Sequence, residues 1–229
     1  SEQPYGRTGP LVRGRGGLVF GTTDGRVVQL DVNLEEVCTA QAGGAVTSAP
    51  AVSDDGIIYV ATDAGRLIGL AGMGALIISE MILPPANGPS VEDGFVVVGT
   101  GNGVAMFTTG GTLEFEIERG RVNGTLFDTD GSIVAWGDDG LVERYDRGGN
   151  VLQTFDVGQP VETNVVPLMQ RRLGIVDVQS NAFVVDADGT TLDRVELGGR
   201  PERQAAVTET GFTYYSLGTK IQAVNFTFV

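Results

Sequence analysis

The chain alternates short apolar runs with corners built from glycine and acidic residues. In the stretch APAVSDDGIIYVATDAGRLIGL (Ala49–Leu70), three apolar runs are separated by Asp-Asp-Gly and Asp-Ala-Gly. The third run recurs along the chain, and its aligned apolar positions lie 40, 37, 38, 40 and 39 residues apart. Six copies with a period near 39 residues indicate a repeat architecture. The aligned positions are Leu30, Leu70, Phe107, Tyr145, Val185 and Val224.

Each copy contains runs with the composition of β-strands. Three clear runs are rich in Val, Ile, Phe and Tyr, and glycine or Asp-Gly corners separate them, which is typical of hairpins. A less regular fourth run follows, as in VCTAQA, ALIISEM, LEFEIE and VLQTFDV. Four antiparallel strands per repeat predict a propeller blade, so we expect an all-β fold: a single six-bladed β-propeller of four-stranded antiparallel blades over residues 1–229. The expected repeats are approximately 8–46, 47–84, 85–121, 122–160, 161–200 and 201–229.

The repeat resembles a known family. The stretch Ala49–Leu70 is similar to the quinoprotein-like (PQQ-like) propeller repeat, with the pattern s-P-a-v, D-G-x-h-Y-V-x-T, x-G-x-h-h-x-L-D, and the resemblance covers nearly the whole chain. That family ranges from quinone-dependent dehydrogenases to non-catalytic scaffolds. Its enzymes, as the resemblance implies, use bound calcium, a catalytic Asp, a tryptophan floor and often a vicinal disulfide. This chain has one tryptophan, Trp136, and one cysteine, Cys38, so we expect the non-catalytic branch without PQQ, and Trp136 in the core.

The last copy ends directly after its third run, in KIQAVNFTFV. A closed ring needs a fourth strand there, and the amino-terminal segment Ser1–Thr8 is one candidate to supply it. Pro4 and Gly6 make that segment a poor strand. Two alternatives stay open: a last blade of three strands, or an outer edge formed by FTFV itself.

The composition of the chain argues against several classes of function. The net charge of −14 argues against binding nucleic acid or an anionic membrane surface. The absence of histidine excludes Ser-His-Asp and Cys-His catalysis and every His-ligated metal. Cys38, as the only cysteine, cannot form an intrachain disulfide. The longest uncharged apolar stretch, Leu67–Ile78, is broken by glycine and too short for a transmembrane segment.

The acidic corners raise the question of a metal. DADGTTLD (Asp186–Asp193) looks like a truncated calcium loop in which Asp186, Asp188 and a distal Asp193 would be the ligands. It lacks the third acidic residue that such a loop places before its glycine. Asp-Gly is also a preferred corner of a tight hairpin, because both residues tolerate positive φ. We expect the hairpin role and keep calcium as the alternative.

A second candidate site follows from propeller geometry. The first strand of each blade lines the central channel, so the residue before it lies at the channel mouth. The six equivalent positions are all polar and could receive a partner loop or a small anion, or simply cap strand ends. Arg121, with Arg7 and Arg200, adds positive charge nearby. The six positions are Thr8, Ser48, Asn87, Asn123, Glu162 and Arg203.

The segment PLMQRRLG (Pro167–Gly174) replaces a short corner by a longer basic one with an exposed Met169, and unusual loops on regular scaffolds often carry function. We predict a non-enzymatic binding or scaffold module, monomeric and extracytoplasmic, for a protein partner or a small ligand at the channel mouth. The alternative is a propeller enzyme: a glycan hydrolase or lyase with paired carboxylates, or a degenerate quinoprotein-type oxidoreductase.

Overall fold

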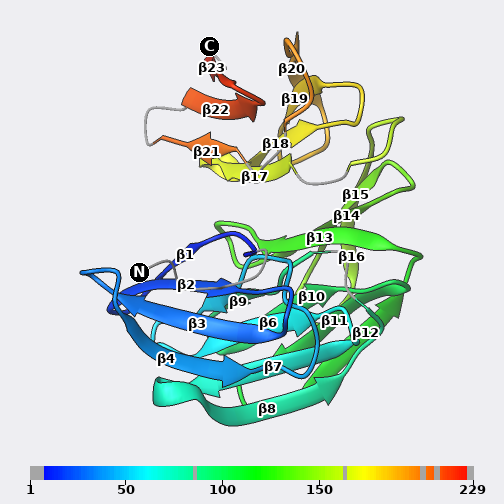
Figure 1. The fold of residues 1–229 in the computed structure, drawn as a ribbon. Helices are drawn as coiled ribbons and strands as arrows, with labels where there is room; N and C mark the ends of the chain where they lie inside the picture. The colour runs from blue at the N-terminus through cyan, green and yellow to red at the C-terminus, as the bar shows by residue number, and fades with distance from the viewer. Residues whose placement is uncertain (1–7, 85–86, 162–163, 202–204, 209–211, 226–229) are drawn as a thin grey trace. The chain divides into compact units, whose positions relative to one another are not determined.

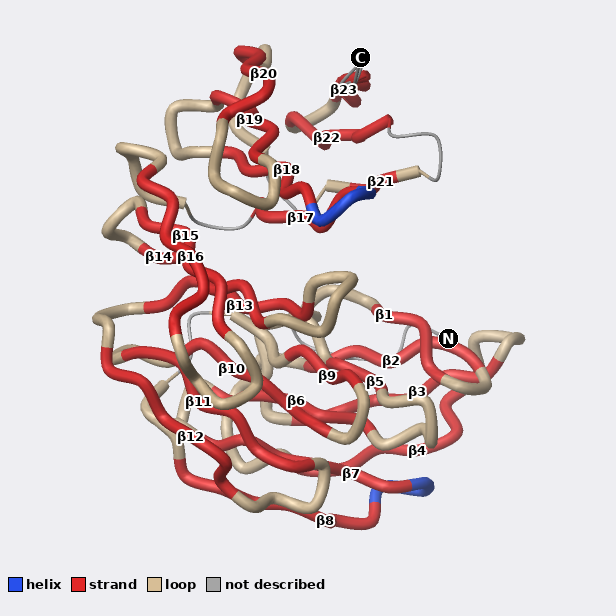
Figure 2. The backbone as a smooth tube through the Cα atoms, turned by 180° about the vertical axis from the view of Figure 1, so that it is seen from behind, coloured by secondary structure: helices blue, strands red, loops and turns tan. Residues whose placement is uncertain are grey.

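The computed structural model of the chain describes residues 8–84, 87–161, 164–201, 205–208 and 212–225 (Figure 1). These residues form β-strands joined by tight corners, with two short 3-10 segments, η1 (Gly72–Gly74) and η2 (Met169–Arg171). Figure 2 shows short blue helical segments next to long stretches of red strand. No helix in the described part of the chain is long and apolar enough to cross a membrane.

The strands form six antiparallel sheets, which we call blades one to six in chain order. In blades one to five, four consecutive strands pair in the order of the sequence, and blade six has three strands among the described residues. Blades one to three contain β1 (Val12–Gly14), β2 (Gly17–Gly21), β3 (Arg26–Asp31), β4 (Glu36–Gln41), β5 (Ala51–Val52), β6 (Ile58–Thr62), β7 (Arg66–Ala71), β8 (Ala75–Met81), β9 (Ser90–Glu92), β10 (Phe95–Gly99), β11 (Gly103–Thr108) and β12 (Leu113–Glu118). Blades four to six contain β13 (Val122–Phe127), β14 (Ile133–Gly137), β15 (Leu141–Tyr145), β16 (Val151–Asp156), β17 (Asn164–Leu168), β18 (Arg172–Val176), β19 (Asn181–Val185), β20 (Thr191–Glu196), β21 (Ala206–Val207), β22 (Phe212–Leu217) and β23 (Lys220–Asn225).

The predicted runs and the observed strands agree closely. The prediction of an all-β chain built from repeated four-stranded antiparallel blades is confirmed for blades one to five, including the irregular fourth runs. The candidates for a fourth strand in blade six, the segment before Thr8 and the residues FTFV, lie outside the described residues.

One irregularity recurs at the same place in every four-stranded blade. Between the third and fourth strands, the pairing register shifts by one residue just before the aligned apolar position, as at Gln29/Leu30 and Gly69/Leu70. Blades three, four and five repeat the shift. A bulge increases the local twist of a strand pair, so the same irregularity twists the outer edge of each four-stranded blade.

The apolar core lies between neighbouring blades. Val19, Val27 and Val46 of blade one pack with Val60 and Ile68 of blade two in one buried cluster. Similar clusters join blades two and three and blades five and six. Full burial of a side chain of this size stabilises the fold by roughly 1.5–3 kcal/mol. The predicted core position of Trp136 is confirmed, since it is 2% exposed in β14.

The chain divides into two compact units, Ser1–Leu126 and Phe127–Val229. The first unit holds blades one to three and nearly all of β13, and the second holds the strands that follow. Within the first unit β1 lies beside β5, and β5 lies beside β9. The first strands of consecutive blades are therefore neighbours, as a propeller arrangement requires.

Candidate functional site

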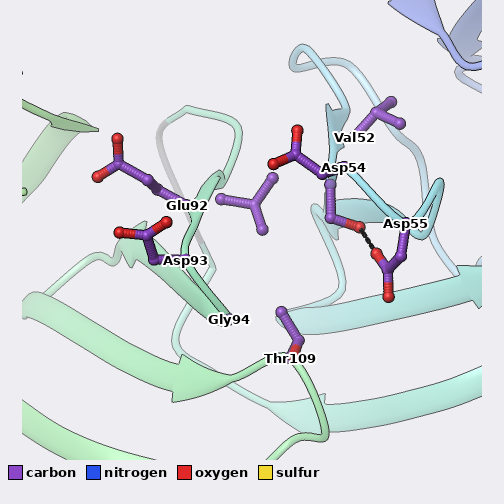
Figure 3. A pocket seen from close by; sticks show the side chains of 9 residues that line it. Val52, Asp54, Asp55, Glu92, Asp93, Gly94 and Thr109 are labelled. Atoms are coloured by element: carbon purple, nitrogen blue, oxygen red, sulfur yellow. Dashed lines mark hydrogen bonds between the residues drawn. The ribbon is translucent and has the colours of Figure 1, made fainter.

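A pocket of about 490 Å³ opens in the first unit, between blades two and three. It lies between two hairpins that each join the first strand of a blade to its second strand; we call such a hairpin the first corner of its blade. Figure 3 shows the lining side chains projecting from these two corners and from the hairpin that holds Thr109. The lining residues are Val52, Ser53, Asp54, Asp55, Val91, Glu92, Asp93, Gly94 and Thr109.

The first corner of blade two, Ser53–Gly56, is held by its own backbone and by Ser53. The Gly56 N–H donates to the Ser53 carbonyl at 2.8 Å, and Gly56 has a φ of +87° that favours glycine. The Ile57 N–H donates to the Ser53 hydroxyl at 3.1 Å, and this hydroxyl donates to the Asp55 carboxylate at 2.5 Å. These hydrogen bonds hold the turn in one conformation. Asp54 makes no ion pair with any described residue.

The first corner of blade three is tighter. Glu92 pairs directly with Phe95, so Asp93 and Gly94 are the two central residues of the turn. Both have positive φ, 47° and 83°, as a two-residue hairpin with the twist of its strands requires. The Gly94 carbonyl accepts a hydrogen bond from the Thr109 N–H at 2.8 Å, which fixes the third wall of the pocket.

A buried tyrosine of blade two contacts Thr109, one of the residues that line the pocket. Tyr59 of β6 is fully buried, and its hydroxyl donates to the Thr109 carbonyl at 3.1 Å. Burial raises the pKa of the Tyr59 phenol, the negative charge of Asp55 raises it further, and the hydrogen bond to Thr109 partly opposes both. The phenol therefore stays protonated and keeps Thr109 in place against the corner of blade three.

The charged side chains that line the pocket are all negative. Four of its nine residues, Asp54, Asp55, Glu92 and Asp93, carry carboxylates, and none carries a positive charge. The half-buried Val52 and the partly buried Val91 add apolar wall. Such a pocket suits a group that has an apolar stem and a cationic head.

Other first corners meet through an arginine. Arg15, in the first corner of blade one, donates from Nη1 to the Asp55 carbonyl at 3.4 Å, and its stem lies against Gly56. In the second unit, Arg171 Nε of the blade-five corner lies 2.7 Å from the Asp130 carboxylate of the blade-four corner. Burial raises the pKa of Asp130, but hydrogen bonds from Ser132 and the charge of Arg171 outweigh it and lower the pKa overall.

The blade-five corner belongs to the segment predicted as an unusual basic loop. Gln170 and Arg171 both have positive φ, 62° and 60°, which is strained for residues with side chains. Arg144, fully buried in β15, donates to the Arg171 carbonyl at 3.2 Å and pairs with the buried Asp128 at 2.5 Å. The predicted exposure of Met169 concerns a side chain outside those the structure describes.

Three of the predicted channel-mouth positions, Thr8, Ser48 and Asn87, precede the first strands of blades one to three, at the opposite ends of these strands from their first corners. A Cβ on Gly9 would approach the Ser48 carbonyl to 3.3 Å, and one on Gly88 would approach the Ala49 carbonyl to 2.0 Å. The connection that contains Thr8 therefore packs against the one that contains Ser48, and the connection that contains Asn87 packs against that same one.

The remaining channel-mouth residues have different surroundings. Asn123 is buried within β13, whereas Arg121 and Arg200 are exposed. The other predicted residues lie outside the described part of the chain: Arg7, Glu162 and Arg203.

The candidate calcium loop has the hydrogen bonds of a hairpin turn. The Asp186 carboxylate accepts from the N–H groups of Asp188 and Thr190, and Asp188 accepts from Thr190 as well. Side-chain hydrogen bonding with Asp186, then with Thr190, lowers the pKa of Asp188. Asp193 lies on β20 and accepts from Arg194 N–H. Within the described residues no three acidic or sulfur side chains are grouped closely enough to hold a metal ion.

The pocket was not among the sites predicted from the sequence, although a signal for it existed. The corner sequences SDDG and EDG follow each other in consecutive repeats, whereas the preceding corner reads RGRG. Aligning the corners, rather than the strands, would have revealed three consecutive acidic hairpins without a basic residue, SDDG, EDG and DTDG, two of which line the pocket.

Comparison with known proteins bears on the fold. No protein-family model matches the chain, and no curated protein matches it. Among 1176 matching chains of solved structures is the computationally designed Ika8 protein, with a TM-score of 0.79 and 15% sequence identity. The match covers 96% of this chain and 71% of that protein. At this identity the likeness concerns the fold alone: the chain is an all-β protein of repeated antiparallel blades, with a propeller-like fold.

Proposed function

We propose that the chain is a non-enzymatic binding module, that its six blades close into a single propeller ring, and that the pocket between blades two and three is its binding site. The observation that carries the binding role is the pocket itself. Its volume of about 490 Å³ falls within the range of roughly 300–1,000 Å³ that is usual for ligand sites. Its walls come from three short hairpins held by internal hydrogen bonds, so the site is preformed.

Ring closure is supported by one exposed side chain. Ile221 in β23 is 77% exposed, whereas the residues at the same position of the other five blades are at most 3% exposed. In the described clusters this position is covered by the next blade along the chain, as Val27 is by blade two. A closed ring would cover Ile221 in the same way. The five buried equivalents are Val27, Leu67, Val104, Val142 and Ala182.

The enzyme alternative has no comparable support. A general acid of the glycosidase kind needs a carboxyl group with a raised pKa. Among the described carboxyl groups, every resolved pKa shift is downward, as for Asp24, Asp31 and Asp146. The first-listed causes are a side-chain hydrogen bond from Arg26 for Asp24, a backbone hydrogen bond from Glu35 for Asp31, and a side-chain hydrogen bond from Asn150 for Asp146. The enzyme reading therefore stays a prediction from the sequence.

The binding role can be tested by nuclear magnetic resonance with pools of short peptides. Isotopically labelled protein would be titrated with basic, acidic and apolar hexapeptide pools while the amide signals of Asp54, Asp93 and Thr109 are followed. We expect at least one pool to shift these signals saturably, and Asp54→Asn to weaken that binding by about tenfold if one charge-assisted hydrogen bond is lost. Glu114→Gln on the exposed outer strand β12 removes the same charge and should leave binding unchanged.

The same titration separates the pocket from the channel mouth. Saturable shifts at Ser48 and Asn87, with no change at the pocket signals, would move the binding site to the opposite ends of the first strands. If no pool shifts either set of signals, the binding role is wrong.

A further inference from the structure

We propose that Asn87 is a site of spontaneous deamidation, at which the folded chain converts an asparagine in the connection before β9 into aspartate or isoaspartate. This inference goes beyond the proposed binding role and does not depend on the pocket.

Three asparagines of the chain precede a glycine: Asn87, Asn102 and Asn123. In an Asn-Gly pair the glycine nitrogen can attack the carbon of the side-chain amide, because glycine has no Cβ to obstruct the approach. The three pairs are equivalent in sequence, so the fold decides how their reactivities differ.

The Asn87–Gly88 pair is arranged for this attack. Asn87 is half-buried and lies outside any strand. The Gly88 N–H donates to the Asn87 side-chain oxygen Oδ1 at 2.8 Å. Because a C=O bond is about 1.23 Å long, the amide carbon Cγ is no more than about 4 Å from the Gly88 nitrogen. Reacting atoms in a near-attack geometry are roughly 3–3.5 Å apart, so the side chain is already turned toward its nucleophile.

The other two pairs are held in different arrangements. Gly103 is the first residue of β11 and pairs with Glu118 of β12. Its N–H donates to the Thr100 hydroxyl at 3.0 Å, which directs the nitrogen away from the Asn102 side chain. Asn123 is 7% exposed within β13, where the sheet fixes the backbone and little water reaches the side chain.

The reaction needs water as its only co-reactant. The Gly88 nitrogen loses its proton to solvent and forms a bond to Asn87 Cγ, which closes a five-membered succinimide ring. The C–N bond of the side-chain amide breaks, and the leaving nitrogen takes up a proton and departs as ammonia. Water then opens the ring at either carbonyl and gives aspartate or isoaspartate. One negative charge is thereby added at a predicted channel-mouth position.

Peptide mapping by mass spectrometry tests the inference on the intact chain. The folded protein would be incubated at mildly alkaline pH and then cleaved after glutamate at mildly acidic pH, where ring closure is slow. The three asparagines then fall in separate peptides, 81–92, 93–114 and 119–143. We expect the mass change from amide to acid to appear in 81–92 at least about tenfold faster than in the other two. In the chain unfolded by urea the three rates should agree within about threefold, because each asparagine precedes glycine.

Asn87→Gln is the matched variant, since its longer side chain would have to close a six-membered ring, which is far slower. It should abolish the mass change in 81–92 and leave the rates in the other two peptides unchanged. Equal rates for the three peptides in the folded protein, or a faster change at Asn102 or Asn123, would overturn the assignment. A rate at Asn87 that is at least about tenfold lower in the folded than in the unfolded chain would overturn it as well, since the fold would then protect this site. The binding role of the pocket is unaffected by any of these outcomes.

Discussion

At the scale of single residues, two buried tyrosines differ in whether their hydroxyl group makes a hydrogen bond. Tyr59 and Tyr215 are both fully buried on second strands of their blades. The Tyr59 hydroxyl donates to the Thr109 carbonyl, whereas the Tyr215 hydroxyl has no hydrogen-bond partner among the described residues. An unpaired buried hydroxyl lowers stability, because it has given up its bonds to water.

Replacing Tyr215 by phenylalanine should therefore cost little or stabilise the fold by about 1 kcal/mol at neutral pH. Burial raises the pKa of Tyr215 to about 12. In the unfolded chain this pKa is ~10, so the stability linked to Tyr215 is complete below pH 10. As the pH rises from 10 to 12, roughly 2–3 kcal/mol should be lost in the native sequence, and Tyr215→Phe should abolish this loss. Urea unfolding at pH 8 measures the first effect, and at pH 11, midway between the two pKa values, about half of this loss, roughly 1.4 kcal/mol, should be present in the native sequence and absent from Tyr215→Phe.

Tyr59→Phe is the matched control for the neutral-pH comparison. It removes a satisfied hydrogen bond and should cost about 1 kcal/mol at pH 8. If both variants lose the same stability at pH 8, the Tyr215 hydroxyl has a partner and the assignment is wrong.

At the scale of strands and corners, the repeats share a backbone and vary their side chains. Strand positions repeat with a period near 39 residues, and the bulge recurs in five blades, because both are needed to build the same sheet. The corners differ in charge, since a hairpin turn restricts φ and leaves the exposed side chains free to vary. The pocket lies between two of the acidic corners, those of blades two and three.

The loops that lead into the first strands of neighbouring blades also approach each other closely. The backbone at Gly88 lies so near blade two that an added Cβ would be 2.0 Å from the Ala49 carbonyl oxygen. Gly88→Ala should therefore lower the free energy of unfolding by about 3 kcal/mol through overpacking. Gly16→Ala, with open space around its Cβ and no positive φ, should change it by less than about 0.5 kcal/mol. Chemical denaturation of both variants gives the comparison, and a neutral Gly88→Ala would show that the two connections are not in contact.

At the scale of the whole molecule, the net charge of −14 and the proposed ring closure have separate consequences. The charge opposes association with nucleic acid and other anionic surfaces, and it favours a cationic partner. Ring closure concerns stability, because it would bury an apolar face of blade six that carries Ile221.

Ile221→Ala tests closure directly. If a neighbouring blade covers Ile221, the truncation should cost about 2–4 kcal/mol in urea unfolding, as is usual for a buried isoleucine. Val32→Ala is the control, since Val32 is 82% exposed on blade one and its loss should be nearly neutral. Equally small effects for the two variants would contradict a closed ring.

Much of the fold could be predicted from the sequence, and little of the site. The strands were predictable because each apolar run is short, local and repeated, so six imperfect copies reinforce one another. The pocket was not, because it depends on which corners become neighbours in space. The pair Arg144–Asp128 was missed for the same reason: nothing local shows that an arginine in a strand will be buried against a carboxylate 16 residues away.

The sequence by itself therefore determined the all-β class, the four-stranded repeat and the turning role of the Asp-Gly corners, since each follows from backbone preferences within a few residues. Tertiary structure alone decided which corners face each other, where an arginine bridges them and where acidic side chains stand around an open pocket. Those features depend on contacts between residues about 40 positions apart, as for Arg15 and Asp55. Hydrophobic period and turn chemistry specify the blade, and the packing of one blade on the next creates the site.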